Sequence, residues 1–363
     1  MNKHQISKIL LIGALTILGA CSTNRQTGQE STAGNSAGAN SVTNNSTSAP
    51  PPTLQSNQQA VQTAPVDWKR VDEAMGRKGT MMPGDVYRFS MPRSDLKVTV
   101  KGVEIKPAFA LGSWAAFKQM PDGQVMAMGD TVMTEDEISP VMLKLQQNGI
   151  GQSALHHHLL YENPRVYYMH LMATGDPVKI AETIKAALDL TKTPPQAVAP
   201  ATNAGNGAES GNPSGTTAAT TPANNQPADL GIDTAQIDSI LGFKGKINGG
   251  VYQISVPRAN KITEMGMEIP PSMGTATAIN FQPTGSGKAA ITGDFVMTGD
   301  EVNNVIRALR ENGIEATALH NHSLADEPRI FYMHFWANDD AVKLARGLRA
   351  ALDKTNSQRG QTP

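Results

Sequence analysis

The sequence predicts an α+β fold made twice: two homologous repeats, each a largely antiparallel sheet packed with about three helices. Segments of the two halves match at an almost constant offset, as Gly129-Asp130 matches Gly293-Asp294. Strand-like apolar runs are grouped together, and helix signals lie between and after them. One pattern of three histidines is present in both halves. These three observations indicate one domain fold used twice.

Each repeat is predicted to begin with a short helix, whose N-cap is Asp67 or Asp233 and which ends at Gly76 or Gly242. In the first repeat, strand-like runs follow at residues 86–91, 96–105, 113–117 and 125–133. A second helix is expected after a capping box in each repeat, and a last helix after an aspartate; the residues concerned are Thr134 with Glu137, Thr298 with Glu301, Asp176 and Asp340. The helices therefore alternate with hairpins, as in an antiparallel sheet with covering helices.

The chain outside the two repeats has the composition of a leader and of tethers. Residues 1–20 contain two lysines and then an apolar run, and the sequence Leu18-Gly19-Ala20-Cys21 resembles the lipobox of bacterial lipoproteins. This resemblance implies cleavage before Cys21 and lipidation of its thiol, which is the only thiol in the chain. We expect a signal peptide at 1–20, a disordered tether at 21–64, repeat domains at 65–193 and 229–356, a disordered linker at 194–228 and a tail at 357–363.

Net charge indicates which partners to expect. Removal of residues 1–20 takes away two lysines and no acid, and leaves 29 basic against 32 acidic residues. This balance gives no electrostatic reason to expect nucleic-acid binding. The expected partners are a membrane, reached through the lipid anchor, and an unidentified ligand or envelope protein. The chain is therefore predicted to lie in the cell envelope, on the extracytoplasmic side.

Six of the eight histidines lie at matching positions of the two repeats. Each set has the pattern A-L-H-x-H, a turn with Pro-Arg, and then Y-M-H: His156, His158 and His170, and His320, His322 and His334. Side chains at i and i+2 of a strand share a face, so the first two histidines project together. With residues 161–165 as the loop, His156 is predicted to lie opposite His170 in the hairpin. Three converging imidazoles can bind Zn²⁺ or another transition metal, which predicts one site in each repeat.

Two other interpretations of these histidines remain open. The imidazoles could form hydrogen bonds within a polar sheet face, or they could bind an anion together with Arg165 and Arg329. His157 is not expected to be a ligand, because it points to the opposite face and Asn321 replaces it in the second repeat. Glu104 and Glu268 are candidates for a further ligand or a general base.

Weaker candidates lie elsewhere in the repeats. Asp130 and Asp294 follow glycines and are predicted to serve turns. Pro-Arg pairs at Arg93 and Arg258 are interpreted as strand ends with exposed salt bridges. A group of methionines that could suggest copper is better explained by core packing; these are Met133, Met169, Met297 and Met333.

The order of these features resembles that of the LppY/LpqO-like bacterial lipoproteins, a domain family without an assigned activity. The resemblance depends on the repeated A-L-H-[HN]-H, on P-R-[VI]-[YF]-Y-M-H and on the lipobox, and it covers both repeats. It implies a tandem of that domain. The predicted function is an envelope lipoprotein with two ligand-binding domains, each with a histidine-ligated metal ion. The alternatives are a metal-dependent hydrolase of the envelope and a purely structural or partner-binding envelope protein.

Overall fold

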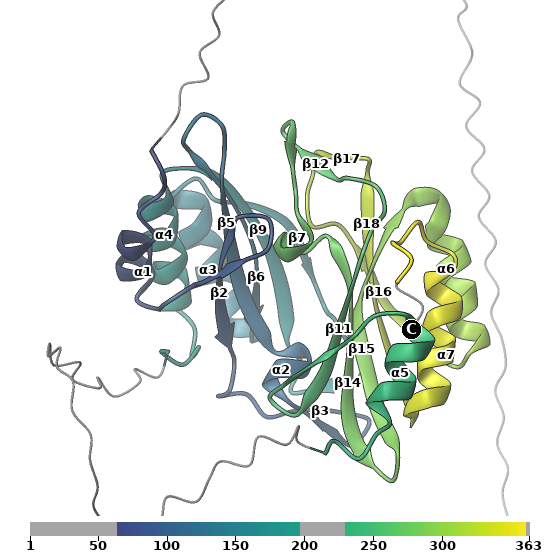
Figure 1. Ribbon diagram of the computed structural model, residues 1–363. Helices are drawn as coiled ribbons and strands as arrows, with labels where there is room; N and C mark the ends of the chain where they lie inside the picture. Colours follow the sequence, from purple (N-terminus) through teal and green to yellow (C-terminus); the bar gives the residue numbers. More distant parts are fainter. Residues whose placement is uncertain (1–63, 197–228, 361–363) are drawn as a thin grey trace, which may run out of the picture. The chain divides into compact units, whose positions relative to one another are not determined.

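The computed structural model describes residues 64–196 and 229–360. The expected leader and lipidation site, the tether up to residue 63, residues 197–228 of the linker and the last three residues of the tail lie outside the described residues. Within the described ranges, each repeat has the same order of helices and strands (Figure 1).

The elements of the first repeat are, in chain order, α1 (Trp68–Met75), β1 (Thr80–Met82), β2 (Val86–Pro92), β3 (Val98–Val100), β4 (Val103–Ile105), α2 (Pro107–Ala110), β5 (Gly112–Gln119), β6 (Val125–Met133), α3 (Glu135–Gln147), β7 (Gly151–His156), β8 (Glu162–Asn163), β9 (Tyr167–Gly175) and α4 (Pro177–Leu188). Those of the second repeat are α5 (Thr234–Leu241), β10 (Lys246–Asn248), β11 (Val251–Pro257), β12 (Thr263–Glu264), β13 (Met267–Glu268), η1 (Pro271–Met273), β14 (Ala276–Gly285), β15 (Lys288–Thr298), α6 (Gly299–Glu311), β16 (Glu315–His320), β17 (Asp326–Glu327), β18 (Ile330–Asp340) and α7 (Ala341–Leu352).

Each repeat contains a six-stranded sheet and a small three-stranded sheet. The large sheets have the orders β1-β2-β5-β6-β9-β7 and β10-β11-β14-β15-β18-β16, and the small ones β4-β3-β8 and β13-β12-β17. Adjacent strands are antiparallel throughout these sheets. The predicted α+β class, with two copies of a largely antiparallel sheet, is confirmed.

The helices begin and end where the predicted signals lie. The Asp67 carboxylate accepts hydrogen bonds from the first turn of α1, and Gly76 ends that helix in the left-handed conformation, with φ 67°. Both capping boxes are present, Thr134 with Glu137 at α3 and Thr298 with Glu301 at α6. Local hydrogen bonding therefore sets these helix boundaries in both repeats.

The run at 96–105, predicted as one strand, is a tight hairpin. Strands β3 and β4 pair with each other around Lys101 and Gly102, which have φ values of 48° and 83°. Two consecutive residues with positive φ are typical of a two-residue hairpin turn. The lysine at the first of these positions hides the turn, because it is not a usual turn residue.

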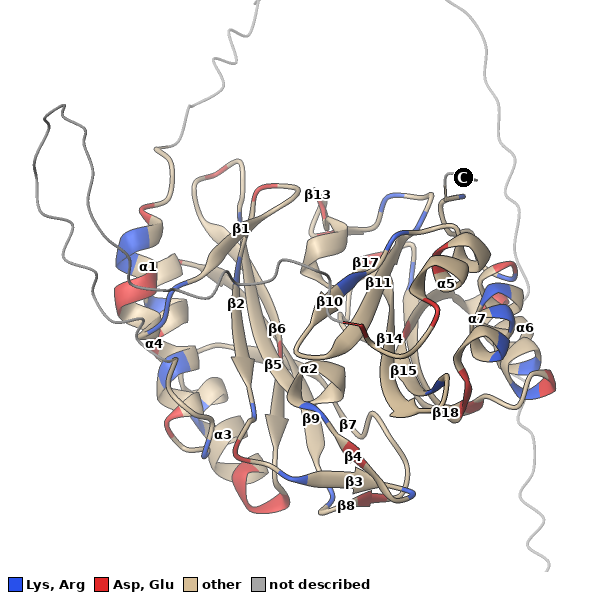
Figure 2. Ribbon diagram, turned by 60° about the horizontal axis from the view of Figure 1, so that its bottom comes forward, with Lys and Arg blue, Asp and Glu red and all other residues tan. Residues whose placement is uncertain are grey.

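One face of each large sheet packs against the three long helices of the same repeat (Figure 1). In the first repeat this core joins Val71 of α1 and Leu145 of α3 to Phe117 and Leu171 of the sheet. Four methionines at matching strand positions of the two repeats lie in these cores, as predicted. Met133 and Met169 lie in the first core, and Met297 and Met333 in the second. Figure 2 shows charged residues of both signs on the helices, while the strands carry few.

The other face of each large sheet packs against the other repeat. Every residue of β6 is buried, so this strand is covered on both faces. One apolar cluster joins Phe109 of the first repeat to Trp336 of the second, and another joins Met126 to Met273. The two repeats therefore share part of their packing, and their inner sheet faces meet inside a single compact unit.

The two Pro-Arg pairs do not form exposed salt bridges. Arg93 is 0% exposed, and its Nη1 donates to the Glu137 carboxylate at 2.7 Å and to the carbonyl oxygen of Val132 at 2.8 Å. Arg258 binds Glu301 in the same way, at 2.6 Å. Because these glutamates are also the capping-box residues, each arginine ties a strand end to the start of a helix. The sequence-based interpretation was wrong about exposure: a planar guanidinium can be buried when it pairs with a carboxylate and a carbonyl oxygen, as both arginines do here.

Candidate metal centre

The histidine hairpin has a different register from the predicted one. His156 lies opposite Tyr168, and Ala154 lies opposite His170. The loop is longer than residues 161–165, because β7 ends at His156 and Glu162–Asn163 form β8, which pairs with β3 of the small sheet. Ser153 is an extra residue in β7 and shifts the register there. A bulge of this kind re-aims the side chains that follow it.

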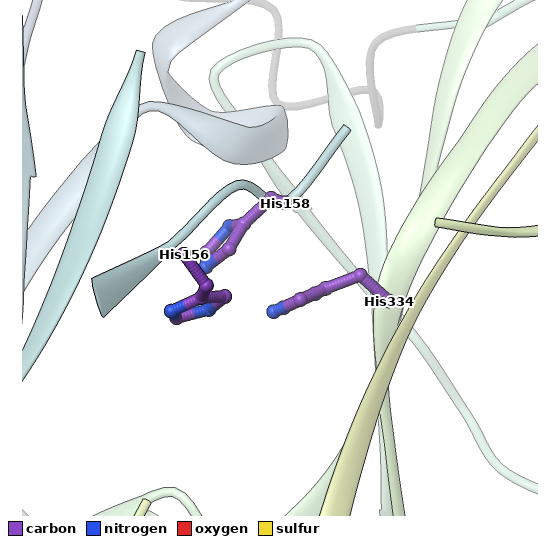
Figure 3. Close-up of side chains that lie close together, drawn as sticks. All are labelled: His156, His158 and His334. Carbon is purple, nitrogen blue, oxygen red and sulfur yellow. The ribbon is translucent and has the colours of Figure 1, made fainter. Parts of the chain in front are cut away.

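The structure brings all six histidines into one cluster. The rings of His156 and His320, from different repeats, are stacked with their centroids 3.8 Å apart. Around this pair, the ring centroids of His158 and His334 are 3.8 Å apart, and those of His170 and His322 are 4.0 Å apart. Figure 3 shows His334 of the second repeat directed toward His156 and His158 of the first. The expectation of two separate sites, one in each repeat, is therefore wrong.

The cluster has approximate twofold symmetry. His156 and His320 form the central pair, and the second histidine of each H-x-H pattern meets the third histidine of the other repeat. One tyrosine ring of each repeat extends the arrangement. The ring centroids of His158 and Tyr168 are 3.3 Å apart, and those of His322 and Tyr332 are 3.4 Å apart, with the rings stacked. Each histidine set is thus assembled from both halves of the chain.

Two aspartates, Asp130 buried and Asp294 partly buried, lie beside the histidines, and the prediction that they serve turns was wrong. Asp130 lies within β6 and Asp294 within β15, on the inner sheet face. Oδ2 of Asp294 is 3.1 Å from Nε2 of His322, and Oδ2 of Asp130 is 3.5 Å from Nε2 of His158. One signal in the sequence was available: an aspartate in the middle of a long apolar run stands at the same position in both repeats.

His157 and Asn321 have the same structural role and are not part of the cluster, as predicted. Nδ1 of His157 is 2.8 Å from the carbonyl oxygen of Val166. Nδ2 of Asn321 donates to the equivalent carbonyl oxygen, that of Ile330, at 2.7 Å. Both side chains therefore close the loop between the second and third histidines, which explains why an amide can replace the imidazole.

Hydroxyl groups from the two bulges connect the histidine segments across the repeats. Oγ of Ser153 donates to the backbone carbonyl of His322 at 2.6 Å. Thr317, the bulge residue of β16, donates from Oγ1 to the backbone carbonyl of His158, also at 2.6 Å. Each repeat thus holds the H-x-H segment of the other in position.

Unpaired polar atoms are concentrated in this cluster. Among the residues that the structure describes, eleven buried side-chain nitrogen and oxygen atoms have no hydrogen-bond partner, and nine of these belong to five of the six histidines and to the two aspartates. Buried polar groups are nearly always satisfied, because an unsatisfied one loses its hydration without compensation. The Nε2 atoms of His320 and His334 lie 2.9 Å apart, within hydrogen-bond distance of each other. The donor atoms therefore lack a partner that they require.

Five of the six imidazoles have lowered pKa values, which favours the neutral form that a metal ion needs. Burial, together with nearby His320 and His170, lowers the pKa of His156 to about 2. Burial also holds the pKa values of four others well below the ordinary value, those of His158, His170, His322 and His334. The pKa of Asp294 is raised to about 7, mainly by burial. Both effects are typical of groups that are desolvated without a fixed counter-charge.

Three overlapping groups of donor atoms are close enough together to hold a metal ion. They are His156 with His158 and His334, His156 with His170 and His320, and Asp294 with His320 and His322. Within each group the ligand atoms lie within 4.8 Å of one another. The first two groups contain residues of both repeats, so a metal ion held there would join the two halves of the chain.

The predicted accessory residues are not among these groups. Glu104 and Glu268 are exposed on the small-sheet strands β4 and β13, and Glu268 binds Lys261 at 2.6 Å. Arg165 and Arg329 are exposed in the loops that follow the H-x-H patterns, where Arg329 donates to the carbonyl oxygen of Leu324.

Comparison with known proteins identifies the family. The sequence matches the family described as Domain of Unknown Function (DUF1259) over residues 69–190 and again over 235–354. The chain belongs to this family. It carries the domain in tandem, and the two matched stretches correspond to the two repeats of the structure.

Other comparisons add little. No curated protein matches the chain. A solved structure, that of a trimeric bacterial microcompartment shell protein, PduB, is 10% identical, and the alignment covers 75% of this chain and 87% of that chain with a TM-score of 0.18. A score this low carries no argument about fold or function. In residues 64–196 and 229–360, no helix has the length and apolar character needed to cross a membrane.

Proposed function

We propose that this tandem domain binds transition-metal ions in a single centre shared by its two repeats. One observation carries the proposal: nine buried donor atoms without partners belong to five of the six clustered histidines and to two aspartates beside them. An unfilled centre of this kind leaves buried polar groups unsatisfied, whereas a bound ion satisfies several of them at once.

The symmetry of the cluster supports a centre with about two ions, each four-coordinate. The first ligand set is His156, His158 and Asp130 of the first repeat with His334 of the second. The second set is His320, His322 and Asp294 with His170 of the first repeat. In both sets the H-x-H pattern and the aspartate come from one repeat, and the third histidine is exchanged between repeats.

The donor types favour zinc or another transition metal. Neutral imidazole suits Zn²⁺, Cu²⁺, Ni²⁺ and Fe²⁺, whereas Ca²⁺ and Mg²⁺ prefer sites made only of oxygen. In the first repeat, Nδ1 of His170 is 3.4 Å from the carbonyl oxygen of Gly129; in the second, Nδ1 of His334 is 2.7 Å from that of Gly293. Such outer contacts orient the ring and leave Nε2 for an ion.

The place of action that we propose is the cell envelope. The leader with the lipobox-like end at Cys21 and the resemblance to LppY/LpqO-like lipoproteins support a chain anchored to a membrane and facing away from the cytoplasm. Its partners there would be the membrane and an unidentified ligand or envelope protein. Metal binding without catalysis is the better-supported function, because both candidate bases of the hydrolase, Glu104 and Glu268, lie outside the donor groups.

The test is the metal content of purified protein, residues 65–356, after exposure to Zn²⁺, Cu²⁺, Ni²⁺ or Mn²⁺ and removal of free metal. The proposal predicts about two tightly bound ions per chain, and loss of both in the variant that combines His156→Ala with His320→Ala. His157→Asn is the matched control, since it reproduces the second repeat. Absence of bound metal in the unmodified protein would refute the proposal.

A further inference from the structure

A methionine cluster lies beside the histidines on the inner sheet face. Seven of the eleven residues of this apolar cluster are methionines, including Met126, Met128, Met172, Met267 and Met273. Met128 and Met172 face each other across β6 and β9, two positions away from Asp130 and His170. Because residues two apart in a strand share a sheet face, Met128 and Met172 lie on the same face as Asp130 and His170 and directly beside them.

The second repeat offers a matched comparison for this cluster. At the equivalent positions of its sheet, Ala290, Thr292 and Trp336 replace Met126, Met128 and Met172. The interface cluster around them contains no methionine among the described residues and is built from aliphatic and aromatic side chains. Both clusters join a sheet to the other repeat, so packing alone does not require methionine there. The difference indicates a role for the sulfur atoms.

Gly274 lies close both to the cluster and to one of the six histidines. Trp114, a member of the cluster, and His322 both lie next to Gly274, where an added Cβ would be 3.1 Å from the Trp114 ring and 3.6 Å from Nδ1 of His322. His322 is 6% exposed, and its Nε2 lies 3.1 Å from Oδ2 of Asp294. Met273, a buried member of the cluster, directly precedes Gly274 in the chain.

We propose that the methionine cluster is a second metal site, which takes a soft monovalent cation such as Cu⁺ or Ag⁺. Thioethers are soft, polarisable ligands that select Cu⁺ over Zn²⁺, and they are uncharged, so their burial costs little when the site is empty. The guanidinium of Arg88 lies 4.2 Å from the Trp114 ring centroid, and the negative charge of Asp130 acts on it. This site is distinct in ligand type from the histidine centre and does not require that centre to be occupied.

The experiment uses Ag⁺, which has the ligand preference of Cu⁺ and does not change oxidation state under these conditions. Protein labelled with ¹³C in the methionine methyl groups is titrated with Ag⁺, with and without Zn²⁺ present, and followed by NMR. We expect the methyl signals of Met126, Met128, Met172, Met267 and Met273 to shift together. The signals of the methionines in the cores between sheet and helices, Met133, Met169, Met297 and Met333, should not shift. Equal shifts in both groups, or no shift in either, would overturn the proposal.

Matched variants provide the second measurement. One variant combines Met126→Leu, Met128→Leu and Met273→Leu, and the control combines Met133→Leu, Met297→Leu and Met333→Leu; all six methionines are buried and leucine is a volume-conserving replacement. The first variant should lose about tenfold or more in Ag⁺ affinity and keep its Zn²⁺ content, and the control should lose neither. Unchanged Ag⁺ affinity in the first variant, or an equal loss in the control, would show that the methionines only fill space. If the unmodified protein binds no Zn²⁺, the histidine centre is refuted, whereas the methionine site is not affected by that result.

Discussion

The two faces of each large sheet have opposite chemistry. Toward the helices, strand β9 places Met169 and Leu171 in an apolar core. On the opposite face the same strand places Tyr168 and His170 against the other repeat, beside the unpaired atoms of the cluster. Neighbouring residues of one strand therefore serve different faces. The outer face packs in the core of the repeat, and the inner face carries donor groups without hydrogen-bond partners.

This contrast separates stability from binding. A change on the helix-covered face should unfold the protein without altering the metal stoichiometry of the folded molecules. A change on the inner face should alter metal binding first. Changes to residues of each face test whether stability and metal binding are separable.

The largest effect is expected from acid acting on the metal-free protein. The five histidines with lowered pKa stay neutral in the folded state, whereas in the unfolded chain they bind protons below about pH 6.5. The unfolded state then binds more protons, so the free energy of unfolding falls as pH decreases from about 6.5. For His156 alone the loss by pH 5 is about 2 kcal/mol. Asp294 and Glu162, whose pKa values burial raises to about 7 and about 8, act in the opposite direction but are fewer than the five histidines.

Denaturant unfolding of metal-free protein between pH 8 and pH 5 measures this effect. The variant with His156→Leu, His320→Leu and His334→Leu serves as the control, and its stability should depend less on pH. An equal acid dependence in both proteins would mean that the inner face does not hold its histidines neutral.

The next largest effect concerns the outer face. Phe117 is 0% exposed in the helix-side core, and Phe117→Ala should lower the free energy of unfolding by about 3 to 5 kcal/mol through lost burial and a cavity. Elemental analysis of the folded fraction should still give the metal content of the unmodified protein. A marked loss of metal there would show that the two faces are not separable.

Smaller changes are expected from the hydroxyl groups that cross between the repeats. Ser153→Ala and Thr317→Val remove the hydrogen bonds to the backbone of His322 and His158. Loss of a hydrogen bond that holds a ligand segment in position reduces metal affinity by about 10- to 100-fold. Competition with a chelator measures the affinity. Thr183→Val, which removes an exposed hydroxyl within α4, is the control and should leave it unchanged.

The smallest effect is expected from His157→Asn. The asparagine should donate to the carbonyl oxygen of Val166 as Asn321 donates to that of Ile330, so metal affinity and stability should change little. A large loss of metal in this variant would place His157 among the ligands and contradict the assigned face.

Much of each repeat could be predicted from local signals. The capping boxes, the left-handed glycines and the alternating apolar strands depend on neighbouring residues, and their positions agree with the structure. The six histidines could also be identified, because the same spacing is present twice. These features require no knowledge of what a segment packs against.

The grouping of the histidines could not be predicted, because it depends on contacts between the repeats. The spacing within one hairpin is equally compatible with a site inside each repeat, and the bulge at Ser153 changes the register that such a site would need. A further signal was present in β6: Met126 and Met128 alternate with Ala127, so apolar side chains occupy both faces of the strand. A strand that is apolar on both faces is buried on both, which requires a second layer beyond the helices.

The most direct test of the shared centre is the metal stoichiometry of a chain in which only the second repeat is changed, with His320, His322 and His334 replaced by alanine. The three histidines of the first repeat remain intact in this variant. A shared centre predicts that the variant retains no tightly bound ion, because the first ligand set has lost His334 and the central pair has lost His320. One ion held by the first repeat with the affinity of the unmodified protein would contradict the account.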